Sequence, residues 1–233
     1  MNHRIYLDNA ATTQMSEAVK QEMEPYLLQD FGNASTAYSY GEEAKTAIEH
    51  ARKIIAESLE AKPGEIYFTS GGSESDNWAI KCIAGERKGK GKHIITSTIE
   101  HHAILRTCQY LEKKGYEITY LPVDHDGCVS VEDVERNIRP DTILISIMFA
   151  NNEIGTIEPI KEIGEIAHKH GILFHTDAVQ AFGQVPINVD EMNIDMLSCS
   201  GHKLNGPKGI GFLYIRKGVK IRSFVHGGAQ ERK

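Results

Sequence analysis

Apolar residues recur along the chain with two alternating spacings. Over residues 42–59 they lie three or four positions apart, which places them on one face of a helix. Residues 65–70 form a short, mostly apolar run, as a strand does. This exchange repeats, and it predicts helices over residues 73–84, 102–114, 131–138 and 160–170 and strands over residues 93–98, 117–122, 142–150 and 172–175.

Short strands that are apolar on both faces and separated by helices are typical of a parallel sheet covered on both sides. We therefore predict an α/β fold of three layers, with helices on both faces of a mainly parallel sheet. A final strand is predicted over residues 209–216, and an antiparallel direction is left open for it. No repeat, low-complexity tract or proline-rich linker marks a domain boundary, so one large domain is the simplest expectation.

Charge and cysteine usage exclude several classes of protein. The net charge is −6 and the basic residues are dispersed among acidic ones, so the basic surface of a nucleic-acid-binding protein is not expected. The four cysteines form no CxxC pair in a chain too long to need disulfides, which indicates a reducing cytoplasm. No signal-peptide pattern and no apolar run of about 18 residues occurs, so we expect neither export nor a membrane span.

Ligands of open α/β sheets bind at the carboxyl ends of the strands, and four junctions of this kind are rich in glycine or polar residues. They cover residues 69–74, 151–155, 175–180 and 198–203. In the first, two glycines precede a helix that begins at Ser73, and free amides at a helix start can bind phosphate. Taken singly, each junction is equally well a turn, a helix cap or a solvated lysine. Together they offer a phosphate cradle, then an acid in Asp177, then an amine in Lys203, which are the groups that pyridoxal phosphate needs.

These segments resemble the cysteine desulfurase family of class V, fold-type I pyridoxal-phosphate enzymes, and in detail its housekeeping branch. The resemblance extends over essentially the whole chain and is carried by residues 6–13, 68–77, 100–101, 151–156, 175–180, 200–203 and 227–232. It implies that the intact protein is a homodimer that converts L-cysteine to L-alanine. The sulfur would pass as a persulfide to sulfur-acceptor or iron-sulfur scaffold proteins, for cluster assembly or tRNA thiolation.

The resemblance implies a function for each of nine residues. Lys203 would hold the cofactor as a Schiff base and act as the base at the substrate α carbon. Asp177 would pair with the pyridine nitrogen, and His101 would stack on the ring and move protons. The other six would be cofactor ligands, with Asn152 and Gln180 at the ring hydroxyl and Gly72, Ser73, Ser200 and His202 at the phosphate. Asn151 stays an alternative to its neighbour Asn152, and no metal site is expected.

The resemblance also implies that the chain is incomplete. It divides the sequence into an N-terminal segment, residues 1–15, and a pyridoxal-phosphate-binding large domain, residues 16–233. Family members continue for well over a hundred residues, through a loop with the catalytic cysteine and a small C-terminal domain. Cys199 adjoins the proposed site, but alternation with Ser200 would turn its thiol away. We therefore expect this chain alone to be inactive.

Two points leave the function open at this stage. Tyr38 stands where the family usually has a histidine, so substrate preference does not follow from the motifs. Another class V enzyme, such as a selenocysteine lyase or an aminotransferase, would share all nine residues. A non-catalytic module that keeps the fold is the alternative from a different class.

Overall fold

The computed structural model describes residues 4–228 and 230–231. Residues 1–3 of the predicted N-terminal segment, and residues 229, 232 and 233, lie outside the described part. Seven strands form one sheet in the order β1-β7-β6-β5-β4-β2-β3. Their bounds are β1 Ile66–Thr69, β2 His93–Ser97, β3 Glu117–Leu121, β4 Thr142–Ser146, β5 Leu173–Asp177, β6 Met196–Ser200 and β7 Gly211–Ile215.

The directions of the strands confirm the predicted mainly parallel sheet. β3, β2, β4, β5 and β6 run parallel to one another. β7 is inserted between β1 and β6 and is antiparallel to both, which answers the question left open by the sequence. The carboxyl ends of β4, β5 and β6 therefore meet at one edge of the sheet, where a ligand site is expected.

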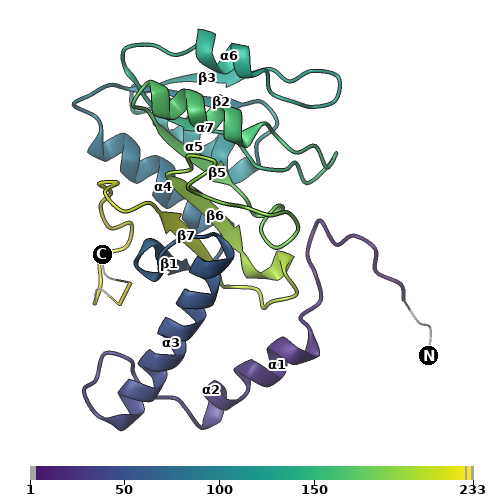
Figure 1. Ribbon diagram of the computed structural model, residues 1–233, viewed down its shortest axis with the longest axis vertical. Helices are drawn as coiled ribbons and strands as arrows, with labels where there is room; N and C mark the ends of the chain where they lie inside the picture. The colour runs from purple at the N-terminus through teal and green to yellow at the C-terminus, as the bar shows by residue number, and fades with distance from the viewer. Residues whose placement is uncertain (1–3, 229, 232–233) are drawn as a thin grey trace.

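Helices cover both faces of the sheet and give three layers (Figure 1). On one face lie α4 (Gly72–Glu86) and α5 (His102–Glu112); on the other lie α3 (Ser39–Ser58), α6 (Val131–Arg136) and α7 (Ile160–Lys169). Each face has its own apolar core, because alternate residues of each strand point to opposite sides. α7 illustrates the periodicity, since Ile160, Ile163 and Ala167 are its buried apolar positions.

The N-terminal part leads away from the sheet as an arm (Figure 1). It contains two short helices, α1 (Glu17–Met23) and α2 (Pro25–Leu28), which bury none of their residues. Ser16 caps α1 by accepting a hydrogen bond from the Val19 amide, and Pro25 starts α2. In the described ranges, no helix combines the length and apolarity that crossing a bilayer requires.

Several boundaries differ from the sequence prediction. β6, α1 and α2 were not predicted. The β6 strand was missed because its polar Ser-Cys-Ser ending is not typical of a buried strand. β5 runs to Asp177, two residues beyond its predicted end, since its polar last residues are buried rather than in a loop. β4 ends at Ser146, four residues before the predicted end, although the Phe149 amide still donates to the Asp177 carbonyl.

Candidate functional site

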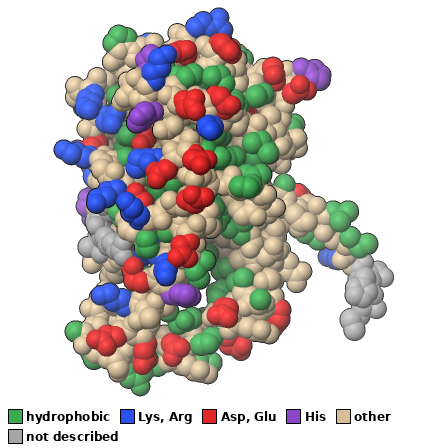
Figure 2. Space-filling view, viewed as in Figure 1, with side chains coloured by type: hydrophobic (Ala, Val, Ile, Leu, Met, Phe, Trp, Pro, Cys, Tyr) green, Lys and Arg blue, Asp and Glu red, His purple; other side chains and the backbone are tan. Residues whose placement is uncertain are grey.

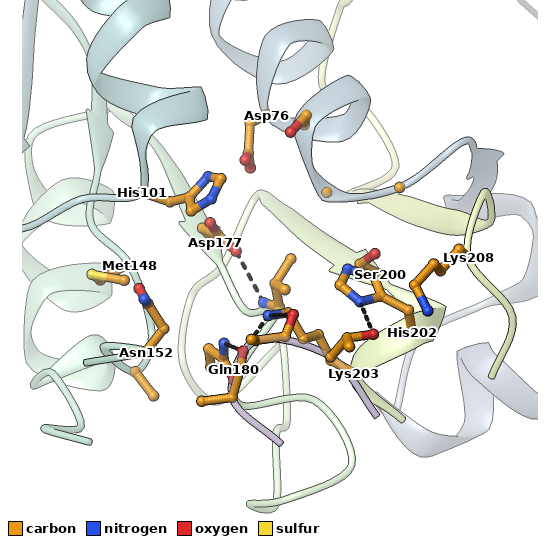
Figure 3. Close-up of a pocket in the computed structure, with 18 of the residues that line it drawn as sticks. Asp76, His101, Met148, Asn152, Asp177, Gln180, Ser200, His202, Lys203 and Lys208 are labelled. Atoms are coloured by element: carbon orange, nitrogen blue, oxygen red, sulfur yellow. Dashed lines mark hydrogen bonds between the residues drawn. The ribbon is translucent and has the colours of Figure 1, made fainter. Parts of the chain in front are cut away.

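A cleft of about 870 Å³ opens at the carboxyl ends of the parallel strands. In Figure 3, Asp76, His101 and Asp177 lie together on one side, and Ser200, His202 and Lys203 lie on the other. All nine residues singled out in the sequence line this cleft: Gly72, Ser73, His101, Asn152, Asp177, Gln180, Ser200, His202 and Lys203. The fold thus brings together positions that come from five separate segments, while the function of each residue stays a prediction.

The start of α4 forms the end of the cleft that suits an anion. Gly71 precedes the helix with φ of +145°, a conformation that side chains rarely adopt, and it offers no side chain to cap the helix. A Cβ on Gly72 would lie 2.7 Å from Val179 Cγ2, so the close approach of these segments needs glycine. The first amides of the helix have no partner within it, and Ser200 and His202 line the same cleft. These features fit a phosphate group.

Asp177 provides a buried carboxyl group in the middle of the cleft. It is the last residue of β5, is 5% exposed, and accepts a hydrogen bond of 2.9 Å from the Val179 amide. Burial raises the pKa of this carboxyl, and the hydrogen bond and the nearby His101 and Lys203 act in the opposite direction. A cation bound against Asp177 would stabilise its charged form.

His101 stands beside Asp177 as the N-cap of α5. Its Nδ1 accepts a hydrogen bond of 3.1 Å from the Ala103 amide, so a neutral ring carries its proton on Nε2. The ring is exposed and lines the cleft, as a residue that stacks on a bound ring must.

Lys203 lies on a short 3-10 turn, η2 (Gly201–Lys203), and its amine is held by backbone carbonyls. Its Nζ donates to the carbonyl of Ala11 at 2.9 Å and to that of Ala10. Burial lowers the pKa of this amine, against the opposing charges of Asp177 and Asp8. A larger fraction of the amine is therefore neutral than for a lysine in water, as a nucleophile requires.

Residues 10–12 of the N-terminal arm form one wall of the cleft, and Thr13 follows them. Ala10 also accepts a hydrogen bond from Gln180 Nε2 at 2.9 Å. The Thr13 amide donates to the His202 carbonyl at 2.8 Å, and Thr12 Oγ1 lies 3.0 Å from His202 Nδ1. The arm thus fixes both Gln180 and the Lys203 turn from the opposite end of the sequence.

The adjacent asparagines have different environments. Asn151 is buried and shapes its own turn: its Oδ1 accepts from the Glu153 and Ile154 amides, and its Nδ2 donates to the Ile99 carbonyl. Asn152 lines the cleft and makes a side-chain hydrogen bond of 3.0 Å to Glu153. The geometry therefore favours Asn152 over Asn151 as a ligand-binding residue.

The four thiols are absent from the residues that line the cleft. Cys199 is 1% exposed and packs in the core beneath α3 and α7, on the face of β6 opposite Ser198 and Ser200. Burial raises the pKa of this thiol, which further disfavours the reactive thiolate. Tyr38, which stands where the family usually has a histidine, is the N-cap of α3, is 60% exposed, and is not among the residues that line the cleft.

Asp76 is a cleft residue that the sequence analysis did not single out. It lies on the buried face of α4, four residues before Ile80 and seven before Ile83, and is 1% exposed. An acid within an apolar helix face was the available signal, because such a position rarely holds an unpaired charge.

Asp76, His101 and Asp177 each place one potential ligand atom within 4.8 Å of the others, a spacing that would also suit a metal ion. Burial raises the pKa of both carboxyl groups, so a metal would first have to displace protons from this pocket. The wider set of residues fits pyridoxal phosphate better, since it includes an anion site, a buried acid and an amine of lowered pKa.

Comparison with protein families matches residues 5–233 to the family described as aminotransferase class-V. A cysteine desulfurase IscS of Methanosarcina thermophila is 62% identical over 232 residues, and a putative cysteine desulfurase IscS 1 of Bacillus subtilis is 54% identical over 230. These alignments cover 100% and 99% of this chain but 57% and 61% of the relatives. The chain thus spans less than two thirds of the length of the curated relatives it matches.

Solved structures also resemble the chain. A NifS-like protein superposes with a TM-score of 0.96 at 44% identity, covering 99% of this chain and 64% of the other. A structure described as SspA in complex with cysteine has a TM-score of 0.95 at 49% identity, covering 98% and 66%.

Proposed function

Because the chain belongs to the aminotransferase class-V family, we propose that it is the pyridoxal-phosphate-binding portion of a cysteine desulfurase. The observation that carries the proposal is the convergence of the start of α4, Asp177 and Lys203 on one cleft. The desulfurase names of the relatives support the activity, and the cysteine in one similar structure supports L-cysteine as the substrate.

When bound, pyridoxal phosphate supplies an aldehyde that reacts with amines and a ring that accepts electrons. Lys203 would present a neutral amine to that aldehyde, and the same amine would take a proton from the substrate α carbon once it is free again. The carbonyls of Ala10 and Ala11 hold Nζ at the cleft and so limit its rotation. Both functions depend on the lowered pKa of Lys203.

The remaining residues would bind and orient the cofactor. Asp177 would hold a proton on the ring nitrogen through a charge-assisted hydrogen bond. His101 would cover one face of the ring, while Asn152 and Gln180 would donate to its hydroxyl. The phosphate would lie against the start of α4, where the residues proposed to bind it are Gly72, Ser73, Ser200 and His202.

Partners and location are proposed on the same basis. The arm carries exposed apolar side chains, visible on the segment that projects from the body in Figure 2, among them Ile5 and Leu7, each 83% exposed. Such a surface supports contact with another polypeptide, and we propose a homodimer together with sulfur-acceptor or scaffold proteins. All four cysteines are free, which supports a reducing cytoplasm.

Chemical trapping tests the proposal. The chain is loaded with pyridoxal phosphate, reduced with borohydride and mapped by mass spectrometry, and the label is expected on Lys203. Lys203→Ala should abolish the label, whereas Lys208→Ala, a change at another cleft lysine, should retain it. A label on Lys208, or no label in protein that demonstrably holds the cofactor, would contradict the assignment.

An assay of alanine release tests the desulfurase activity. Cleaving the carbon–sulfur bond needs a thiolate beside the substrate sulfur, and none of the four thiols lines the cleft. We therefore expect no turnover of L-cysteine by the chain alone, and partial turnover when the part found only in the longer relatives is supplied as a separate polypeptide. Repeated turnover by the chain alone, with a persulfide on one of its own cysteines, would overturn this expectation.

A further inference from the structure

Asp76 is a buried acid with an oxygen that lacks a hydrogen-bond partner. Its side chain comes from the first turns of α4 and faces the cleft beside His101 and Asp177 (Figure 3). The residue is 1% exposed, and its Oδ1 makes no hydrogen bond to any part of the chain that the structure describes. Since an unpaired buried carboxylate is costly, the protonation state of Asp76 needs a physical explanation.

Among the described residues, no lysine or arginine forms an ion pair with Asp76, and its neighbouring ring nitrogens belong to His101, within 4.8 Å, and to His175. His175 of β5 has its Nε2 3.7 Å from Asp76 Oδ1, but both ring nitrogens are engaged by hydroxyl groups, with Ser146 at 2.8 Å and Ser198 at 3.0 Å. Burial lowers the pKa of His175 to about 3, so the ring is neutral at ordinary pH. The other facing carboxyl groups are Asp177 of β5, which raises the pKa of Asp76, and Glu100 of the segment between β2 and α5, whose own pKa burial raises to about 8.

The two aspartates differ in what compensates their charge. Asp177 accepts a hydrogen bond from the Val179 amide, and this bond together with the nearby His101 and Lys203 lowers its pKa against the effect of burial. For Asp76, burial raises the pKa well above the ordinary value and Asp177 raises it further, while the Ser198 hydroxyl group acts in the opposite direction. Two neighbouring carboxylates in a buried site repel each other, which favours the state in which the pair keeps one proton.

We propose that Asp76 is a positioning residue that keeps this proton as a neutral acid, so that the single negative charge of the pair stays on Asp177. The inference rests on the proposed function, in which Asp177 faces the cationic ring nitrogen of the cofactor. One negative charge then balances one positive charge in this part of the cleft. A second carboxylate would leave an uncompensated charge in the core.

Infrared spectroscopy of the full chain, with and without pyridoxal phosphate, tests this proposal. A protonated carboxyl group has its own carbonyl-stretch band, which shifts in heavy water. At neutral pH, Asp76→Asn is expected to remove one such band from both forms of the protein. The matched control Glu100→Gln should remove a different band and leave that of Asp76 in place, and Asp177→Asn should remove none from the cofactor-loaded form.

Cofactor affinity supplies a second readout. Asp76→Asn mimics the neutral acid and should weaken binding by less than about threefold, whereas Asp76→Leu, which removes the polar neighbour of Asp177, should raise Kd about tenfold, or about 1.4 kcal/mol. If the cofactor binds but Asp76→Asn leaves the band in place, or Asp177→Asn removes it, the inference is wrong. If no cofactor binds at all, the proposed function fails, and the cofactor-free spectrum still decides where the proton resides.

Discussion

The two faces of the central sheet differ most where the strands end. On the face beneath α4 and α5, apolar residues such as Leu173 and Met196 give way to His175, Asp177 and Ser198 toward the carboxyl edge. On the face beneath α3 and α7, the residues that alternate with them, Phe174 and Leu197, belong to the apolar core. The same short strands therefore carry a ligand site on one side and a conventional core on the other.

This difference shows that buried strand positions can carry polar side chains when those side chains are paired with one another. The polar face is as inaccessible as the apolar one, with His175 and Ser198 fully buried. Its polar groups satisfy one another across strands, as in the two hydrogen bonds of the His175 ring. Substitutions on the polar face should change cofactor chemistry and pH dependence, and substitutions on the apolar face should change stability alone.

The largest effect is expected at Asp177. Asp177→Asn keeps the shape but removes the charge that would hold the ring-nitrogen proton, so cofactor should still bind while α-proton exchange of L-alanine slows. The loss should be about two to three orders of magnitude, or about 3–4 kcal/mol, measured by NMR in heavy water. An unaltered exchange rate would show that Asp177 only fixes the turn at Val179.

The next effect concerns pH. Glu100 is buried and accepts hydrogen bonds from Ser97 and the Met148 amide, and burial raises its pKa from 4.5 to about 8. Between these values the unfolded chain releases a proton that the folded protein keeps, so the free energy of unfolding falls as pH rises from about 4.5 to about 8. Glu100→Gln should reduce that fall by an amount on the order of 2 kcal/mol, measured by urea unfolding at pH 5 and pH 8. Parallel pH dependence in both proteins would contradict the prediction.

A smaller effect is expected on the apolar face, at Cys199. Cys199→Ser buries a hydroxyl group in the core and should lower the free energy of unfolding by about 1–2 kcal/mol, without altering borohydride labelling of Lys203. Cys199→Ala separates the cost of polarity from the cost of lost volume. Loss of labelling in either folded variant would mean that Cys199 takes part in cofactor binding.

The smallest effect, and the one of opposite sign, is expected at Thr176. This residue lies between His175 and Asp177 but points to the apolar face, and its buried Oγ1 makes no hydrogen bond to the described residues. Thr176→Val should therefore raise the free energy of unfolding by about 0.5–1 kcal/mol in a urea titration. Destabilisation would indicate that the hydroxyl group has a partner on that face.

The helices and the apolar parts of the strands, on both faces, could be predicted from the sequence. Helix periodicity located α3 to α7 within a few residues, and apolar runs located every strand except β6. The family match confirmed the class V resemblance that the motifs implied. The prediction failed where strands become polar while staying buried, because the burial of Ser198 and Ser200 depends on helix α4 above them rather than on local composition.

Prediction of the candidate site was also limited, because some of its residues are defined by contacts between distant parts of the sequence. Lys203 and Asp177 could be singled out because glycine and polar clusters surround them in the sequence. Asp76 could not be, because its importance depends on Asp177 and His175, about a hundred residues later in the chain. A buried acidic residue can be recognised as part of the site only once its neighbours in the fold are known.

The hydrogen bonds between the arm and the Lys203 turn have a consequence for synthesis on the ribosome. The residues they join, such as Thr13 and His202 or Ala11 and Lys203, are separated by 189 and 192 positions. At the usual pace of translation, roughly 10–40 s pass between the appearance of the first partner and the second. During that interval residues 10–12, which line the cleft in the folded protein, have no partner to pack against. The cofactor would therefore bind late in translation, after nearly all strands of the sheet have been synthesised.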